Sequence, residues 1–141
     1  MTPDIAKPAP IADEDTQPFW DACKAHELRV QQCSACGRFR WPPRGFCPAC
    51  FSWEHTWARL SGRGTVHSFS VVHHVVNPAF KAEAPYVVAL ISLEGTEGHV
   101  KLASNVVGCP WEEVRVGMEV EVVFQELNED ITLPKFRPVA G

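Results

Sequence analysis

From residue 60 onwards, apolar and polar residues alternate with the two-residue period of β-strands. The clearest example is EVEVVFQEL at 119–127, where valines and a phenylalanine alternate with glutamates and a glutamine. Turn residues separate five such runs, because glycine, proline and asparagine interrupt strands. The predicted strands are 66–76, 86–93, 99–107, 119–127 and 133–139.

These five runs predict a small closed β-structure over residues 60–141. A helical turn is expected at 110–114, between the third and fourth strands. Five strands with a helical insertion after the third are typical of an oligonucleotide/oligosaccharide-binding (OB) barrel, although a β-sandwich with as many strands has a similar pattern. Pro134 and Pro138 predict that the last strand lies at an edge, since proline has no N–H for a second ladder.

The N-terminal part divides into an arm at 1–15 and a helical segment at 16–29. The arm is rich in proline and acids, and we predict that it is mobile. A helix start is indicated by Thr16, which can cap, and by Pro18 in the first turn. Phe19 and Trp20 lie on its apolar stripe, which is expected to pack within the chain or against a partner.

Residues 30–59 are rich in cysteine, proline and aromatic residues and predict an irregular segment that a metal holds together. Cys33, Cys36, Cys47 and Cys50 form two C-x-x-C pairs separated by ten residues. Each pair can aim two thiolates at one point, so that four sulfurs surround a tetrahedral metal. We predict zinc, with iron as the main competitor because tetrahedral sulfur suits both.

Two other interpretations of these cysteines fit less well. Disulfides are rare in the cytosol, where we expect this chain to reside, and a thioredoxin motif would not occur twice. Four thiolates also leave no open position for substrate, so the predicted metal is structural. The remaining cysteines, Cys23 and Cys109, are expected to be small buried apolar residues.

Composition and charge narrow the functional classes. The chain has 141 residues, 45% hydrophobic and 21% charged, which excludes a wholly disordered protein. No run approaches the roughly 18 apolar residues of a membrane span, and the N-terminus lacks a signal-peptide pattern, so we predict a cytoplasmic protein. Residues 24–63 hold seven bases and two acids although the net charge is −4, which indicates a local anionic partner.

Taken in order, several stretches resemble the zinc-ribbon/OB-fold proteins that were long called a domain of unknown function and are associated with acyl-CoA enzymes. The resemblance covers about 19–138 and rests on FWDACKAHELRVQQCSACG, RWPPRGFCPAC, LSGRGTVHSFSVVHH, APYVVALISLEG, VGMEVEVVF and LPKFRP. It implies a mainly β, α+β chain with a short N-terminal helix, a rubredoxin-like zinc ribbon and a five-stranded OB barrel.

The resemblance also implies a function. Such a chain is expected to be a non-catalytic accessory or scaffold subunit of a thiolase-like enzyme, or of a hydratase, that helps to bind CoA or an acyl-CoA thioester. Arginine forks can bind phosphates, and aromatic rings can stack on adenine or line the pantetheine arm. The candidate CoA-binding or docking residues are Arg38, Arg40, Trp41, Arg44, Phe46 and Arg63. The competing interpretation is that these aromatics fill the ribbon and the arginines are solvated.

No catalytic constellation is evident in the sequence. His73 and His74 are adjacent on a predicted strand, where neighbours point to opposite faces, and no nucleophile or phosphate-loop motif is present. Any thioester chemistry is therefore expected from a partner chain. The alternative from a different class is a protein that binds single-stranded nucleic acid, but the acidic barrel half and the pI of about 5.8 argue against it.

Overall fold

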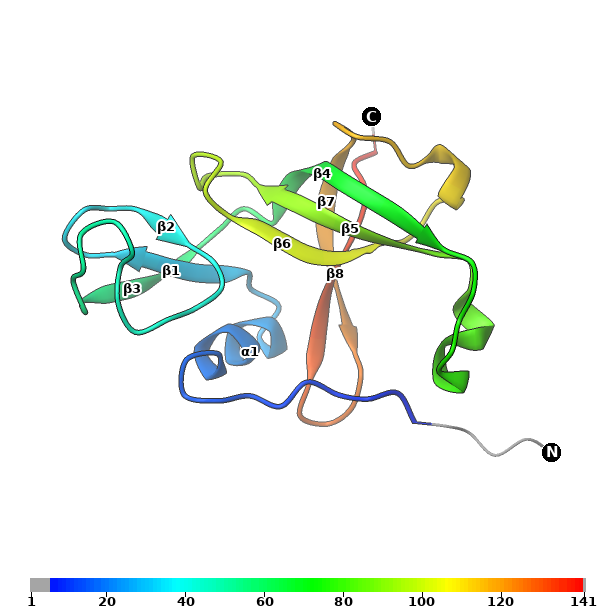
Figure 1. The fold of residues 1–141 in the computed structure, drawn as a ribbon, viewed down its shortest axis with the longest axis horizontal. Helices are drawn as coiled ribbons and strands as arrows, with labels where there is room; N and C mark the ends of the chain where they lie inside the picture. Colours follow the sequence, from blue (N-terminus) through cyan, green and yellow to red (C-terminus); the bar gives the residue numbers. More distant parts are fainter. Residues whose placement is uncertain (1–5, 141) are drawn as a thin grey trace.

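The computed structural model describes residues 6–140 and divides them into a helix, a small sheet and a barrel (Figure 1). Residues 1–5 of the predicted arm lie outside the described residues. No helix in the described part is long and apolar enough to cross a membrane. The elements, in chain order, are α1 (Gln17–Lys24), β1 (Arg29–Cys33), β2 (Phe39–Arg40), β3 (His55–Arg59), β4 (Arg63–Val72), η1 (Pro78–Glu83), β5 (Tyr86–Leu93), β6 (Lys101–Val106), η2 (Trp111–Glu113), β7 (Glu119–Glu126) and β8 (Thr132–Pro138).

Helix α1 ends five residues earlier than the sequence predicts. His26 adopts a left-handed φ of 60°, the N–H of Glu27 donates to the carbonyl of Ala22 at 2.8 Å, and the N–H of His26 donates to the carbonyl of Cys23 at 2.9 Å. These two hydrogen bonds form a Schellman motif, which satisfies the last carbonyls of the helix and reverses the chain. Arg29 is therefore free to start a strand.

The segment that was expected to be irregular contains a three-stranded antiparallel sheet with the order β2-β1-β3. Strand β1 pairs with β3 from Arg29–Arg59 to Cys33–His55, and with β2 at Gln31–Arg40. The first cysteine-containing turn connects β1 to β2, and the second lies in the connection between β2 and β3. Figure 1 shows this sheet at the left, the barrel at the right and α1 below their junction.

The five predicted C-terminal strands form a closed barrel with the order β4-β5-β6-β8-β7, and η2 supplies the predicted helical turn. The OB fold is therefore confirmed. The expectation that the last strand lies at an edge is wrong, because β8 lies between β6 and β7. The prolines are tolerated because the parallel pairing of β8 with β6 is confined to Phe136 and Val106, and the carbonyl of Phe136 accepts from Val107 at 2.7 Å.

A single hydrophobic core joins helix, ribbon and barrel. Phe19 and Cys23 from α1 and Val30 from β1 belong to the same buried cluster as the barrel residues Ile91 and Phe136. Phe19 is 3% exposed, so it packs within the chain and is not a partner contact. The shared core fixes the ribbon against the barrel.

Phe136 fills the centre of this core and is fully buried. We expect Phe136→Ala to lower the free energy of unfolding by about 3–5 kcal/mol, because it removes buried apolar surface and leaves a cavity. Denaturant unfolding followed by tryptophan fluorescence measures the change. Val88→Ala is the matched control, since Val88 points outward from β5 and its truncation should cost less than about 0.5 kcal/mol.

Candidate metal centre

Two turns bring four cysteine sulfurs together at the end of the β1–β3 pairing, where Cys33 lies opposite His55. The Sγ atoms of Cys33, Cys36, Cys47 and Cys50 all lie within 4.8 Å of one another. The closest pairs join different turns, at 3.5 Å for Cys33–Cys50 and 3.6 Å for Cys36–Cys47. A tetrahedral ion with Zn–S distances of about 2.3 Å requires sulfurs about 3.8 Å apart. The cluster therefore has the donor set and the spacing of a four-sulfur metal site.

The two turns have the same hydrogen-bond pattern. In the first, the N–H of Gly37 donates to the carbonyl of Cys33 at 2.9 Å, and in the second, the N–H of Phe51 donates to the carbonyl of Cys47 at 2.8 Å. The residue after each pair has a left-handed backbone, with φ of 80° at Gly37 and 65° at Phe51. Glycine adopts this conformation without strain, whereas phenylalanine has a Cβ that disfavours it.

Backbone groups already favour thiolates within the cluster. The N–H of Cys36 donates to the Sγ of Cys33 and lowers the pKa of Cys33 to about 6. The corresponding N–H of Cys50 lowers the pKa of Cys47. At Cys50 the N–H of Ser52 also lowers the pKa, but the neighbouring sulfurs and burial outweigh it and raise the pKa to about 12. Four adjacent thiolates thus need a cation to offset their mutual repulsion.

A buried glutamine organises the loop between the two turns. Gln31 is 1% exposed, and its Oε1 accepts from Nε of Arg40 at 2.7 Å and from the N–H of Arg44 at 2.9 Å. Its Nε2 lies 3.3 Å from Nε2 of His55 on β3. Gln31 is not among the residues expected from the sequence to be functional, although its two-residue spacing from Cys33 places both side chains on the same face of β1.

The comparisons with known proteins agree with this architecture. Residues 20–55 match the family model of the ChsH2 rubredoxin-like zinc ribbon domain, and residues 57–125 match that of the ChsH2 C-terminal OB-fold domain. A DUF35 domain-containing scaffold protein of Methanocaldococcus jannaschii is 41% identical over 77% of this chain and 79% of its own length. This chain belongs to the ChsH2/DUF35 family.

Two further similar proteins are described as parts of enzymes that have more than one subunit. A chain of the Ltp2-ChsH2(DUF35) aldolase superposes with a TM-score of 0.83 at 37% identity, covering 92% of this chain and 98% of that one. A probable enoyl-CoA hydratase alpha subunit of Thermomonospora curvata is 39% identical over 96% of this chain. The chain spans only 41% of that subunit's length. The family model and the cysteine cluster are together consistent with a zinc-ribbon metal site.

The candidate CoA-binding arginines of this DUF35 chain differ in their availability. Arg38 and Arg44 are exposed on the ribbon. Arg40 is 4% exposed and already donates to Gln31 and, from Nη2, to the carbonyl of Arg44 at 2.9 Å. Its Nη1 is buried without a hydrogen-bond partner in the described part of the chain. Arg40 therefore holds the ribbon loop in place instead of reaching a ligand at the surface.

The candidate aromatics also separate into two groups. Trp41 packs inward, and the centroid of its ring lies 4.5 Å from the centroid of the Phe19 ring. Phe46 is 39% exposed and lies 5.7 Å from the ring of Trp53, which is 72% exposed. Phe51, between them in sequence, is 71% exposed. We call the exposed side chains of Phe46, Phe51 and Trp53 together the ribbon aromatic face; Phe46 and Trp53 are in ring contact, and Phe51 lies between them in the sequence. The aromatic residues on either side of the second C-x-x-C pair are the sequence signal for it.

Arg63 lies on the barrel at the start of β4, apart from the arginines of the ribbon. It borders a groove that also contains Glu94, Glu97 and Glu119. Three carboxylates around one guanidinium make this groove unfavourable for phosphates. Arg63 is thus a less favourable candidate for a CoA contact than the exposed Arg38 and Arg44 of the ribbon.

The other residues considered for chemistry do not form a catalytic group in the described structure. His73 and His74 follow the end of β4 and are exposed, and the ring of His73 lies 5.1 Å from that of Trp111. Cys23 is fully buried, and burial raises its pKa to about 12. Cys109 is half-buried. Burial is the main cause that raises the pKa of its thiol, and the negative charge of Glu113 raises it further.

Substitutions of Gly37 test whether the turn of the first cysteine pair requires a residue that tolerates a left-handed backbone conformation. A Cβ at this position meets nothing within 4 Å, so Gly37→Ala should cost only backbone strain, about 1–2 kcal/mol of the free energy of unfolding. Denaturant unfolding at saturating zinc measures the loss. Gly37→Asn is the control and should cost less, because asparagine tolerates this backbone conformation. Equal losses for the two variants would contradict this explanation.

Proposed function

We propose that this chain is a non-catalytic accessory subunit of a thiolase-like enzyme complex, in which it helps to bind CoA or an acyl-CoA thioester. A single zinc ion bound by Cys33, Cys36, Cys47 and Cys50 maintains the ribbon and takes no part in the chemistry. Four sulfurs complete its coordination, whereas a catalytic zinc keeps a position for water or substrate.

The observation that carries this proposal is the likeness to the chain of the Ltp2-ChsH2(DUF35) aldolase, which superposes on this chain with a TM-score of 0.83 at 37% identity. Helix, ribbon and barrel of this chain all fall within that match, which covers 92% of its residues. The absence of a catalytic group in the described residues supports the same role, because the reaction then belongs to the partner.

The ribbon aromatic face supports docking. Three large aromatic side chains exposed on one small unit, at 39%, 71% and 72%, are uncommon outside interaction surfaces. Aromatic residues and arginines are enriched at the centres of protein interfaces, and the exposed Arg44 lies two positions before Phe46 in the sequence. We assign partner docking to this face and phosphate contacts to the exposed Arg38 and Arg44.

A second candidate function is that of a partner in an acyl-CoA hydratase. The 39% identity to the probable enoyl-CoA hydratase alpha subunit supports it. Reconstitution with thiolase-like and with hydratase-like proteins encoded in the same genome distinguishes the two roles. Carbon–carbon bond cleavage or formation supports the first, and addition of water to an enoyl-CoA supports the second.

Zinc binding has a direct test. The purified chain should contain about one zinc ion per molecule, and Cys47→Ser should lose it together with the ordered ribbon, because metal binding supplies on the order of 10 kcal/mol of folding free energy to such units. Elemental analysis and amide NMR spectra of the ribbon measure both effects. Cys109→Ser is the control, since Cys109 lies outside the cluster and should retain full zinc content.

Docking is tested on the ribbon aromatic face. Trp53→Ala should weaken the complex with the thiolase-like partner at least tenfold, because exposed tryptophans that become buried are frequent hot spots. Analytical ultracentrifugation of the purified proteins measures the affinity. Val116→Ala removes another exposed apolar side chain, 66% exposed on the barrel, and should leave the affinity unchanged. Unchanged affinity in Trp53→Ala would place the interface elsewhere.

The CoA contact is tested within the assembled complex. Arg38→Ala combined with Arg44→Ala should weaken CoA binding about tenfold or more, because each arginine can donate charge-assisted hydrogen bonds to phosphate. Dephospho-CoA, which lacks the 3′-phosphate, should lose less affinity on mutation if that phosphate is the one bound. Arg59→Ala is a control for the loss of one positive charge. Arg59 forms an ion pair with Glu27 and lies at the end of the β1–β3 pairing that is farthest from Cys33.

A further inference from the structure

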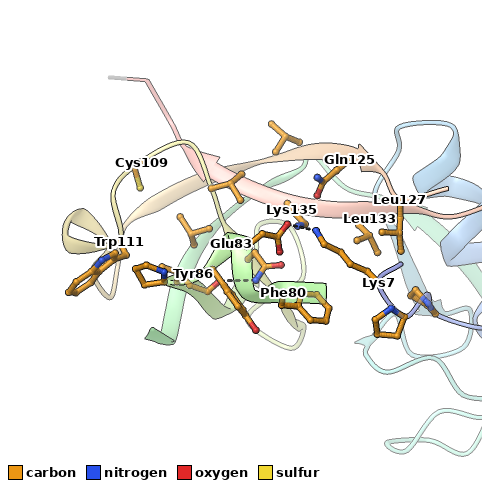
Figure 2. Close-up of a pocket in the computed structure, with 18 residues that line it drawn as sticks. Lys7, Phe80, Glu83, Tyr86, Cys109, Trp111, Gln125, Leu127, Leu133 and Lys135 are labelled. Carbon is orange, nitrogen blue, oxygen red and sulfur yellow. Dashed lines mark hydrogen bonds and ion pairs between the residues drawn. The ribbon is translucent and has the colours of Figure 1, made fainter. Parts of the chain in front are cut away.

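A cleft lies beside the barrel, between η1, the ends of β5 and β6, and the β7–β8 hairpin (Figure 2). Its volume is about 590 Å³, within the range of small-molecule sites. None of its lining residues belongs to the ribbon or to α1, so the cleft is separate from the metal centre and from the ribbon aromatic face. Lys7, Pro8 and Pro10 of the N-terminal arm contribute to its lining.

The walls of the cleft are mainly apolar. Phe80 from η1, Tyr86 from β5 and Trp111 from η2 line the cleft together with Val123 and Leu133 from the β7–β8 hairpin. Val123 and Leu133 are on the faces of their strands opposite to the core residues Val120 and Phe136, respectively. Apolar side chains on the outside of a barrel need a cover, which the arm and η1 provide only in part.

The charges of the cleft leave one cation without a partner. Lys7 on the arm forms an ion pair with Glu83 on η1, and its ammonium lies 5.8 Å from the centre of the Phe80 ring. Lys135 on β8 is half-buried, and among residues 6–140 its ammonium has neither an ion-pair partner nor a hydrogen-bond acceptor. Burial lowers the pKa of Lys135 although Glu83 opposes the shift. A partly desolvated ammonium beside apolar walls is complementary to an anionic or strongly polar oxygen.

We propose that this cleft binds an acyl ligand, with the apolar chain against Phe80, Trp111 and Val123 and the oxygen of its carboxylate or thioester head against Lys135. An apolar chain with a polar oxygen at its head is found both in free fatty acids and in their CoA thioesters. That the ligand is a thioester rests on the proposed function, whereas the assignment of the cleft as an acyl-binding site does not. The ion pair of Lys7 with Glu83 closes the arm over the bound chain.

Calorimetric titration of the full chain with octanoate, octanoyl-CoA, butanoyl-CoA and CoA tests the site. Each buried methylene strengthens apolar binding about threefold to fourfold, so octanoyl-CoA should bind on the order of 100-fold more tightly than butanoyl-CoA. Binding of octanoate alone identifies the free acid as the source, and binding of octanoyl-CoA alone identifies the thioester. Equal affinities for CoA and octanoyl-CoA would overturn the proposal, as would the absence of binding by every acyl probe.

Variants locate the site. Val123→Trp should abolish binding because the indole fills the cleft, and Lys135→Met should weaken octanoate binding about tenfold or more by removing the cation. Lys81→Met is the matched control, because Lys81 is an exposed lysine of η1 that does not line the cleft. Wild-type binding by both cleft variants would overturn the assignment.

A measurement on the unmodified chain guards against variants that fail to fold. Cys109 lines the cleft, so bound octanoate or octanoyl-CoA should slow its alkylation by N-ethylmaleimide, measured by peptide mass spectrometry. Saturating acyl ligand without any slowing would contradict binding at this site. The assembly with a thiolase-like partner is measured separately: if the complex forms but no acyl probe binds, only this inference fails, and if the probe binds but no complex forms, only the proposed function fails.

Discussion

The gathering of four cysteine sulfurs within 4.8 Å of one another is the constraint on which the ribbon depends. The backbone N–H groups of the two turns point at sulfur and favour thiolates, but the raised pKa of Cys50 shows that they do not suffice for all four. A bound cation removes this conflict, because it attracts every thiolate at once. The β2-β1-β3 sheet is too small to supply a comparable apolar core, with β2 only two residues long.

The ribbon is nevertheless not an isolated unit. Val30 from β1 and Phe19 from α1 enter the same core as Phe136 of the barrel, and the N–H of Leu60 donates to the carbonyl of Leu28 where the chain passes from ribbon to barrel. These contacts therefore fix the orientation of the ribbon, and with it that of the ribbon aromatic face, relative to the barrel. A scaffold that presents a docking surface benefits from this rigidity, because less conformational entropy is lost on binding.

Local patterns predicted most of the barrel and the cysteine cluster, and long-range packing decided the rest. Strand β7 has a regular two-residue alternation, and the cysteines of each C-x-x-C pair are close in sequence. Neighbouring residues therefore suffice to identify both features. The position of β8 inside the barrel depends on pairing with β6 at a single residue, Phe136, which no local rule for proline anticipates. Arg40 was expected to be available to ligand, but Gln31, nine residues away, engages it. The acyl cleft combines residues from five separate stretches of the chain and has no linear signature.

The pairing between β6 and β8 also determines where the barrel is weakest. Only Val106 and Phe136 are in register there, so few ladder hydrogen bonds resist separation of these two strands, whereas β7 and β8 are paired over seven positions. Sub-global opening of the native state therefore costs least along this line, and slow amide exchange should be confined to the strands on the opposite side of the barrel. Val106 and Lys135 border both this line and the cleft, so a molecule bound there would oppose the opening and raise the stability of the whole barrel.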